Sequence, residues 1–245
     1  MRVKAIKTSK IIEPGASLEQ ILDQSIIKLT ENNIIAITSK VISICQERFV
    51  KKEEISKYEL IKQEADLMLD TKHNPYNIYL TIKNGILIPS AGIDESNVND
   101  IYVLYPKNVQ QTAISIWQYL RKKYYIQNLG ILITDSHTTI MRRGVTGIAL
   151  GWCGFEPLYS YVNKPDIYGK PLRVTQVNIL DSLATIAVFA MGEGNEQTPL
   201  AIISKAPKIS FLDRPPTLQE EKSVIIPMEE DLYGPLLESA IWLKK

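Results

Sequence analysis

Apolar positions recur along this chain with two different spacings, and the spacing separates the helices that we expect from the strands. Between residues 18 and 29 they recur every three or four positions, as in an amphipathic helix, and Asn32 and Asn33 should end it. Ser17, with Gln20 three residues later, has the capping-box pattern at the start of this helix. The same spacing predicts further helices over residues 51–70, 109–124, 174–191 and about 232–243.

Short unbroken apolar runs predict strands. They cover residues 1–6, 34–37, 101–104, 131–133 and 200–203. Two further strands are expected within residues 77–89, joined by a tight turn at Asn84-Gly85, because both residues tolerate positive φ. Strands and helices mix without a regular βαβ rhythm, so we predict an α+β fold with mixed, largely antiparallel sheets and flanking helices. A length of 245 residues suits one large domain or two small ones.

Composition and charge narrow the classes of function. The 28 basic and 27 acidic residues give a net charge of +1. A nucleic-acid-binding protein usually has a large excess of basic residues, so the composition does not indicate one. The sequence contains no apolar run long enough to span a bilayer and no signal-peptide core at its start. The two cysteines are expected as free thiols in a cytoplasmic protein. With only two histidines, any metal must be held mainly by oxygen.

Three loops rich in small residues follow apolar elements, and each carries an acidic residue. They contain Asp94 with Asn97, Asp135 with Ser136, and Glu193 with Glu196. If the fold brings the loops together, they form an oxygen-rich pocket for a divalent metal and for nucleotide phosphates. The alternative is three unrelated surface loops, since Asp and Gly are common turn residues.

The second of these loops belongs to a longer stretch with candidate anion-binding groups. A polar cluster over residues 134–139 follows the apolar run 131–133, and Arg142 and Arg143 come shortly after it. Guanidinium groups pair with phosphate or carboxylate through two parallel hydrogen bonds. Arg142 and Arg143 are therefore candidates for holding a phosphate or a substrate carboxylate, and the alternative is a structural ion pair. His137 is a candidate for proton removal, and the alternative is a hydrogen-bonding loop histidine.

Four motifs are spaced along the chain. They read SAGIDESNV from Ser90, ITDSHTTIMRRGVTGIALG from Ile133, DIYGKPLRVT from Asp166 and MGEGNEQTP from Met191. In this order they resemble the motifs of the coenzyme F420-0:L-glutamate ligase (CofE) family. The resemblance extends from the first strand to about Ser204 and is dense from Ser90 onward. It implies a single domain over residues 1–245 with two lobes, and an intertwined homodimer.

The resemblance also implies an activity and its cofactors. Family members join L-glutamate to a carboxylate acceptor through an acyl-phosphate, with GTP, Mg²⁺ or Mn²⁺, and often K⁺. By this resemblance, Asp94 and Asp135 would hold one metal, and Ser136 and Glu193 a second. Nucleotide binding would involve residues from three segments, namely Ser39, Lys40, Asn97, Met191, Gly192, Glu193, Gly194, Asn195, Glu196, Gln197 and Thr198.

Two departures from the family pattern bear on the nucleotide. Ile44 stands where family members usually have a second lysine, and residues 9–12 differ from the usual Leu-Pro-Leu-Ile. GTP and ATP therefore both remain candidates. The acceptor is expected to be F420-0, with a folate as the alternative, because some bacterial relatives extend folates. An alternative from another class of function is a non-catalytic module that binds a nucleotide or a pterin.

Overall fold

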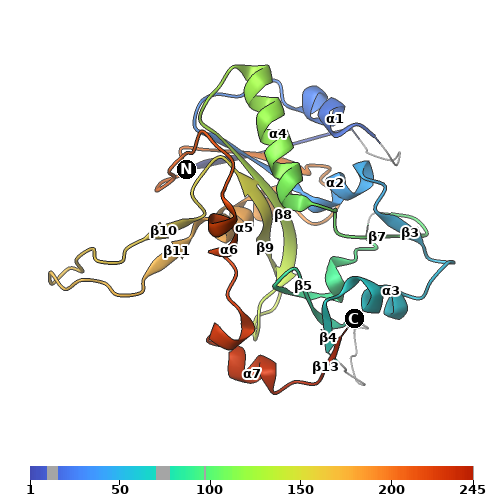
Figure 1. The fold of residues 1–245 in the computed structure, drawn as a ribbon. Coiled ribbons are helices and arrows are strands. Elements are labelled where there is room, and N and C mark those ends of the chain that lie inside the picture. The colour runs from blue at the N-terminus through green and yellow to red at the C-terminus, as the bar shows by residue number, and fades with distance from the viewer. Residues whose placement is uncertain (10–15, 70–77, 97, 245) are drawn as a thin grey trace.

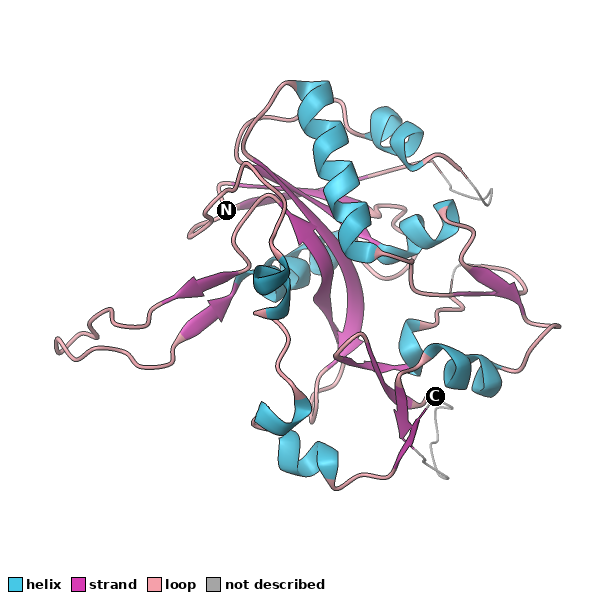
Figure 2. Cartoon of the chain, in the orientation of Figure 1, coloured by secondary structure: helices cyan, strands magenta, loops and turns pink. Residues whose placement is uncertain are grey.

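A five-stranded mixed sheet forms the centre of the molecule (Figures 1 and 2). The computed structural model describes residues 1–9, 16–69, 78–96 and 98–244. Strands β2 and β8 run parallel, and the other neighbouring strands are antiparallel. In sheet order the strands are β1 (Arg2–Ile6), β12 (Leu200–Ser204), β2 (Asn33–Thr38), β8 (Leu129–Thr138) and β9 (Val145–Cys153). The predicted α+β class with mixed sheets is confirmed.

Helices cover both faces of this sheet, which explains why its central strands are apolar without alternation. Ile35 and Ile37 of β2 pack in one core with α4 (Val109–Tyr124), α1 (Leu18–Ser25) and α2 (Ser39–Cys45). Ile34 and Ala36 pack in a second core with α5 (Ile179–Met191) on the opposite face. Each fully buried isoleucine contributes roughly 1.5–3 kcal/mol relative to an exposed one.

A smaller four-stranded sheet lies beside the central one (Figure 1). Asn84 and Gly85 have φ values of 52° and 74°, so the predicted hairpin turn is confirmed. Helix α3 (Lys57–Glu64) packs on this sheet through Leu60 and Ile61. In order the strands are β13 (Trp242–Lys244), β4 (Leu67–Leu69), β5 (Leu80–Lys83) and β6 (Ile86–Pro89).

Two strand pairs and several short helices complete the fold. Strand β3 (Phe49–Lys51) pairs with β7 (Ile101–Val103), next to the small sheet. Strands β10 (Leu158–Ser160) and β11 (Gln176–Asn178) form the base of an arm that projects from the body (Figure 1). The short helices are η1 (Ser90–Gly92), α6 (Leu218–Lys222), η2 (Met228–Glu230) and α7 (Gly234–Glu238). No helix of the described residues is long and apolar enough to cross a membrane.

Three of the predicted helices lose part of their length to strands, and a fourth ends early. The helix starting after Ser17 ends at Ser25, although its predicted cap is present. The helix predicted over residues 51–70 covers only Lys57–Glu64, because Leu67 pairs with Ile82 in the small sheet. The helix predicted over 174–191 begins at Ile179, after strand β11. The last predicted helix is replaced by α7 and strand β13.

Glu64 links α3 to two basic residues, and replacing it should destabilise the fold. Its carboxylate accepts hydrogen bonds from Arg48 at 3.0 Å and from Lys83 at 2.5 Å. Burial opposes ionisation of Glu64, but Lys83 and Arg48 outweigh it and hold its pKa below the ordinary value of 4.5. We expect Glu64→Gln to lower the free energy of unfolding at pH 7 by about 2 kcal/mol, because two partly buried cations lose their partner.

The sign of the pH dependence follows from the lowered pKa. The stabilisation by Glu64 is present above the unfolded pKa and is lost as the pH falls through the folded pKa, below pH 4.5. Urea unfolding at pH 7 and at pH 3 measures both effects. The two proteins should differ at pH 7, and the difference should become smaller at pH 3, whereas equal midpoints at pH 7 would contradict this assignment.

Candidate functional site

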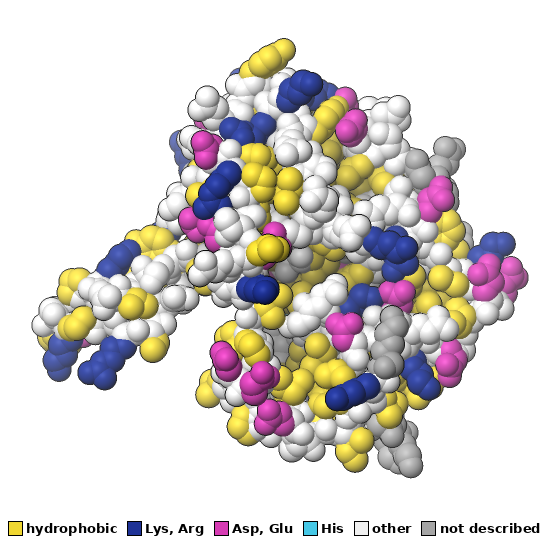
Figure 3. Space-filling model, in the orientation of Figure 1, with side chains coloured by type: hydrophobic (Ala, Val, Ile, Leu, Met, Phe, Trp, Pro, Cys, Tyr) yellow, Lys and Arg dark blue, Asp and Glu magenta, His cyan; other side chains and the backbone are white. Residues whose placement is uncertain are grey.

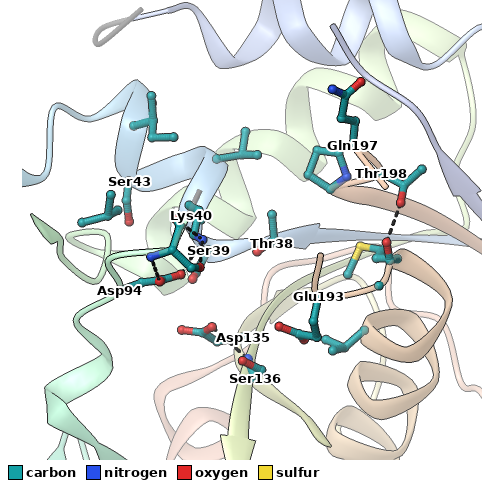
Figure 4. A pocket seen from close by; sticks show the side chains of 18 of the residues that line it. Thr38, Ser39, Lys40, Ser43, Asp94, Asp135, Ser136, Glu193, Gln197 and Thr198 are labelled. Carbon is teal, nitrogen blue, oxygen red and sulfur yellow. Dashed lines mark hydrogen bonds and ion pairs between the residues drawn. The ribbon is translucent and has the colours of Figure 1, made fainter. Parts of the chain in front are cut away.

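One cavity of about 480 Å³ collects most of the acidic and glycine-rich segments singled out from the sequence (Figure 4). Its walls come from five parts of the chain. These are Thr8 and Ser9 after β1, the end of β2 with α2, the segment around Asp94 with the end of β7, Asp135 and Ser136 of β8, and the end of α5 with the loop after it.

The parallel pairing of β2 and β8 brings two of these segments together. Thr38 pairs with Thr134, so the carboxyl end of β2 lies beside the residue that precedes Asp135. Ligand sites commonly form outside the carboxyl ends of parallel strands. The loop after α5 is held over the same edge, because Thr38 donates its backbone N–H to Pro199 at 3.0 Å and Thr8 donates to Gln197 at 3.0 Å.

Lys40 supplies a positive charge inside the cavity. Its ammonium forms an ion pair with Asp94 and donates hydrogen bonds to the Ser96 hydroxyl at 3.0 Å and the Ser96 carbonyl at 3.2 Å. Burial works against ionisation of Asp94, yet Lys40 and the Ser96 N–H outweigh it and lower the pKa of Asp94. The Asp94 carboxylate is therefore charged and already oriented toward a cation.

Asp135 is the acidic residue of the cavity whose ionised form is most strongly disfavoured by burial. Burial raises its pKa to about 7, and the neighbouring charge of Asp94 acts in the same direction. Hydrogen bonds from the Ser136 N–H at 2.8 Å and from the Ser39 hydroxyl favour the ionised form, but they do not offset burial. The Tyr105 side chain is 3% exposed and lies against Asp135, whose charge adds to burial in raising the tyrosine pKa.

Glu193 adds a third carboxylate from the loop after α5. Burial raises its pKa, Asp94 and Glu196 raise it further, and Lys40 and Ser136 act in the opposite direction. Glu196 accepts the Gly194 N–H at 2.8 Å, which gives the loop a tight turn. Gly192 has a φ of 80°, and a Cβ there would lie 2.4 Å from the Glu196 carboxyl carbon, so the turn requires glycine.

The donor chemistry of the cavity fits a hard divalent cation. Carboxylates and a serine hydroxyl are the ligands that Mg²⁺ and Mn²⁺ prefer. Burial is the main cause of the raised pKa values of Asp135 and Glu193, and a cation bound between these carboxylates would favour their ionised forms. Among residues 1–9, 16–69, 78–96 and 98–244, however, no three His, Cys, Asp or Glu side chains are close enough together to enclose a metal.

Most predicted site residues meet at this cavity. Ser39, Lys40, Asp94, Asp135, Ser136 and the segment 191–198 all line it. Asn97 lies outside the described residues. Ile44 and Ser9, where the sequence departs from the family pattern, also line the cavity.

The three residues predicted to be catalytic do not line this cavity. Arg142 and Arg143 are exposed at the tip of the β8–β9 hairpin. The His137 Nε2 atom lies 3.0 Å from the Thr146 hydroxyl across the two strands. Their catalytic roles stay predictions. These side chains would reach the cavity only if the β8–β9 hairpin moved, or if a second copy of the chain supplied them.

Sequence reasoning missed two residues that shape the cavity. Tyr105 follows the predicted strand 101–104, and its ring packs directly over Gly92. Ser43 is 1% exposed, and its hydroxyl has no hydrogen-bond partner among the described residues. Neither has a local sequence signal, since both depend on how α2 and β7 pack together.

The chain matches known proteins along most of its length. Residues 6–205 match the family model described as F420-0:Gamma-glutamyl ligase. A coenzyme F420:L-glutamate ligase from Methanococcus maripaludis is 31% identical over 220 residues, which cover 84% of this chain and 86% of that protein. The ligase of the same name from Methanopyrus kandleri is 27% identical over 220 residues, covering 82% of this chain and 86% of that protein.

Proposed function

Because this chain belongs to the F420-0:gamma-glutamyl ligase family, we propose that it joins L-glutamate to coenzyme F420-0 through an amide bond. Relatives named as coenzyme F420:L-glutamate ligases support the substrates. The observation that carries the proposal is the cavity in which Lys40, Asp94, Asp135 and Glu193 converge. A cluster of charge of this kind suits phosphoryl transfer, in which negative charge builds on the transferring oxygens.

The nucleotide would bind along the loop after α5. Lys40 and the two glycines of residues 192–194 line the same cavity, and glycine lets a phosphate approach the backbone closely. The Lys40 ammonium can turn from Asp94 to a phosphate oxygen, because its pairing partner is partly exposed to the cavity. We propose GTP or ATP as the phosphate donor.

Asp94 and Asp135 would hold one divalent metal, and Ser136 and Glu193 a second. When bound, Mg²⁺ or Mn²⁺ would neutralise the phosphate oxygens and the carboxylates around them. The chain's own contribution is to keep these side chains preoriented. The Ser136 N–H fixes the Asp135 carboxylate at 2.8 Å, and the Ser96 N–H fixes that of Asp94 at 2.7 Å.

The reaction would proceed in two transfers. An oxygen of the acceptor carboxylate forms a bond to the γ-phosphorus as the bond to the nucleoside diphosphate breaks. The neutral amine of L-glutamate then attacks the acyl carbon, phosphate leaves, and the amine loses a proton. His137 is our candidate to receive that proton.

We also propose that the chain works as a homodimer with an interface that includes the arm. The segment between β10 and β11 carries large apolar side chains in solvent, with Ile167 91% exposed and Tyr168 82% exposed. Figure 3 shows this arm standing clear of the body, with apolar and basic side chains along it. Exposed apolar surface on a projecting element is typical of a protein interface.

A ligation assay tests the proposed function. Purified protein is mixed with L-glutamate, Mn²⁺, GTP or ATP, and either F420-0 or a reduced folate, and the products are weighed by mass spectrometry. We expect F420-0 to gain one or more glutamyl units with one phosphate released per unit. Gain on the folate alone would reassign the acceptor, and nucleotide binding without any product would indicate a non-catalytic binding module.

A further inference from the structure

The segment that contains Asp94, which we call the Asp94 loop, begins with a strained backbone. Ser90 and Ala91 have φ values of 51° and 54°, in the left-handed region that residues with a side chain rarely adopt. They follow strand β6 directly and precede Asp94 by only a few residues. Such strain persists only where the surrounding structure holds it in place, and it tends to gather at functional sites.

The Thr81 side chain holds this strained step. Thr81 lies on β5, and its side chain is fully buried. Its hydroxyl accepts the Ala91 N–H at 2.8 Å and donates to the Ile88 carbonyl at 2.5 Å. One hydroxyl therefore satisfies two buried backbone groups and joins the end of β6 to the start of the Asp94 loop.

Thr81 is itself braced across the small sheet. It pairs with Met68 of β4, and Met68 pairs with Leu243 of β13. Leu243 lies outside the residues matched by the family model, and it packs against the core that contains Ala91 and Ile93. The backbone that carries the hydroxyl is therefore held by the neighbouring strands of the small sheet.

The bonds continue from Ala91 to the Asp94 backbone. Ile93 donates to the Ser90 carbonyl at 2.9 Å, and Asp94 exchanges two backbone hydrogen bonds with Val103 at 2.9 and 2.8 Å. The Asp94 side chain then reaches Lys40 in the cavity. A displacement of Ala91 is thus transmitted to the carboxylate through a short and rigid segment.

We propose that Thr81 is a positioning residue for Asp94, acting through the Ser90–Ala91 step without touching a ligand. Its effect on metal binding rests on the proposed function, in which Asp94 is a metal ligand. Residues that orient metal ligands in this way commonly alter metal affinity by about 10- to 100-fold when they are replaced.

Three variants separate positioning from simple loss of stability. Thr81→Val keeps the shape but removes the hydroxyl, and Thr81→Ser keeps the hydroxyl. Ile61→Val removes one methylene from the same core, where Ile61 is fully buried, and serves as the control for a weakened small sheet. The two readouts are the hydrogen exchange of the Ala91 amide and the half-saturating Mn²⁺ concentration in the presence of nucleotide.

We expect Thr81→Val to speed exchange at Ala91 by roughly tenfold or more, since its N–H loses its acceptor. Mn²⁺ binding should weaken by about 10- to 100-fold, with Thr81→Ser and Ile61→Val close to the parent. Parent-like exchange and Mn²⁺ binding in Thr81→Val, or equal weakening in Ile61→Val, would overturn the proposal. A parent that binds no Mn²⁺ would refute the metal assignment, while exchange at Ala91 would still decide whether Thr81 holds the loop.

Discussion

Replacing Asp135 with asparagine is expected to lower the ligation rate by about a thousandfold or more. The Asp135 carboxylate is the most strongly desolvated acid of the cavity, and its pKa is raised to about 7. A divalent metal bound with the nucleotide would favour the ionised carboxylate. The asparagine amide carries no charge and would bind that metal more weakly. The variant should therefore lose the increase in melting temperature that nucleotide and Mn²⁺ produce together in the parent.

The same substitution should have the opposite effect on the protein without ligands. Because the folded pKa of Asp135 is raised, ionising this group lowers the stability of the fold as the pH rises from the unfolded value of 3.8 through about 7. Asp135→Asn removes that cost and should melt at a higher temperature than the parent above pH 7.

Asp23→Asn is a matched control for Asp135→Asn. Asp23 pairs with Lys123 and Tyr119, and neither it nor these partners line the cavity. It should keep both the activity and the ligand-induced shift. An Asp135→Asn variant that binds nucleotide and Mn²⁺ like the parent would contradict the metal assignment.

Replacing Gly92 with alanine is the second change for which we expect a large effect. A Cβ at this position would lie 2.2 Å from the Tyr105 ring, and the backbone φ is +71°. Either the ring or the Asp94 loop must move, and overpacking of this kind costs about 1–3 kcal/mol in addition to the strain of a positive φ. Since Tyr105 contacts Asp135 and Gly92 precedes Asp94, stability and ligation should fall together.

Gly169→Ala separates the two contributions to this effect. Gly169 has a similar φ of +81°, but no atom lies within 4 Å of a Cβ built there. Thermal melting of both variants should show a much larger loss for Gly92→Ala, and only that variant should lose nucleotide-dependent stabilisation. Equal losses would mean that the contact with Tyr105 is unimportant.

Elements governed by local sequence were predictable. Helix α4 occupies residues 109–124, as its spacing indicates, and the Asn84-Gly85 turn joins β5 and β6. Strand β2 was recognisable because helices bury both of its faces, which removes the need for alternating polar residues.

Contacts between distant segments explain what the sequence did not reveal. The polar cluster after Ile133 was expected to follow the strand, but β8 continues to Thr138 because β9 pairs with it beyond a bulge at Ile133 and Thr134. Extended strand advances about 3.3 Å per residue, so the three residues from Asp135 to Thr138 carry the chain roughly 10 Å onward. Arg142 and Arg143 therefore lie beyond the cavity, although they are close to Asp135 in sequence. The pairing of Lys40 with Asp94 likewise depends on a contact across 54 residues, for which no local pattern exists.

The central claim is that the cavity activates the acceptor carboxylate as an acyl-phosphate. The transfer of an oxygen atom from the acceptor to phosphate tests this claim most directly. F420-0 labelled with ¹⁸O in its acceptor carboxylate is incubated with the protein, L-glutamate, nucleotide and Mn²⁺, and the released phosphate is analysed by mass spectrometry. If the cavity activates the carboxylate as an acyl-phosphate, the first glutamyl unit added to labelled F420-0 should leave one ¹⁸O atom in phosphate. Product carrying one glutamyl unit together with wholly unlabelled phosphate would contradict this route, and no product from either nucleotide would contradict the assignment of F420-0 as the acceptor.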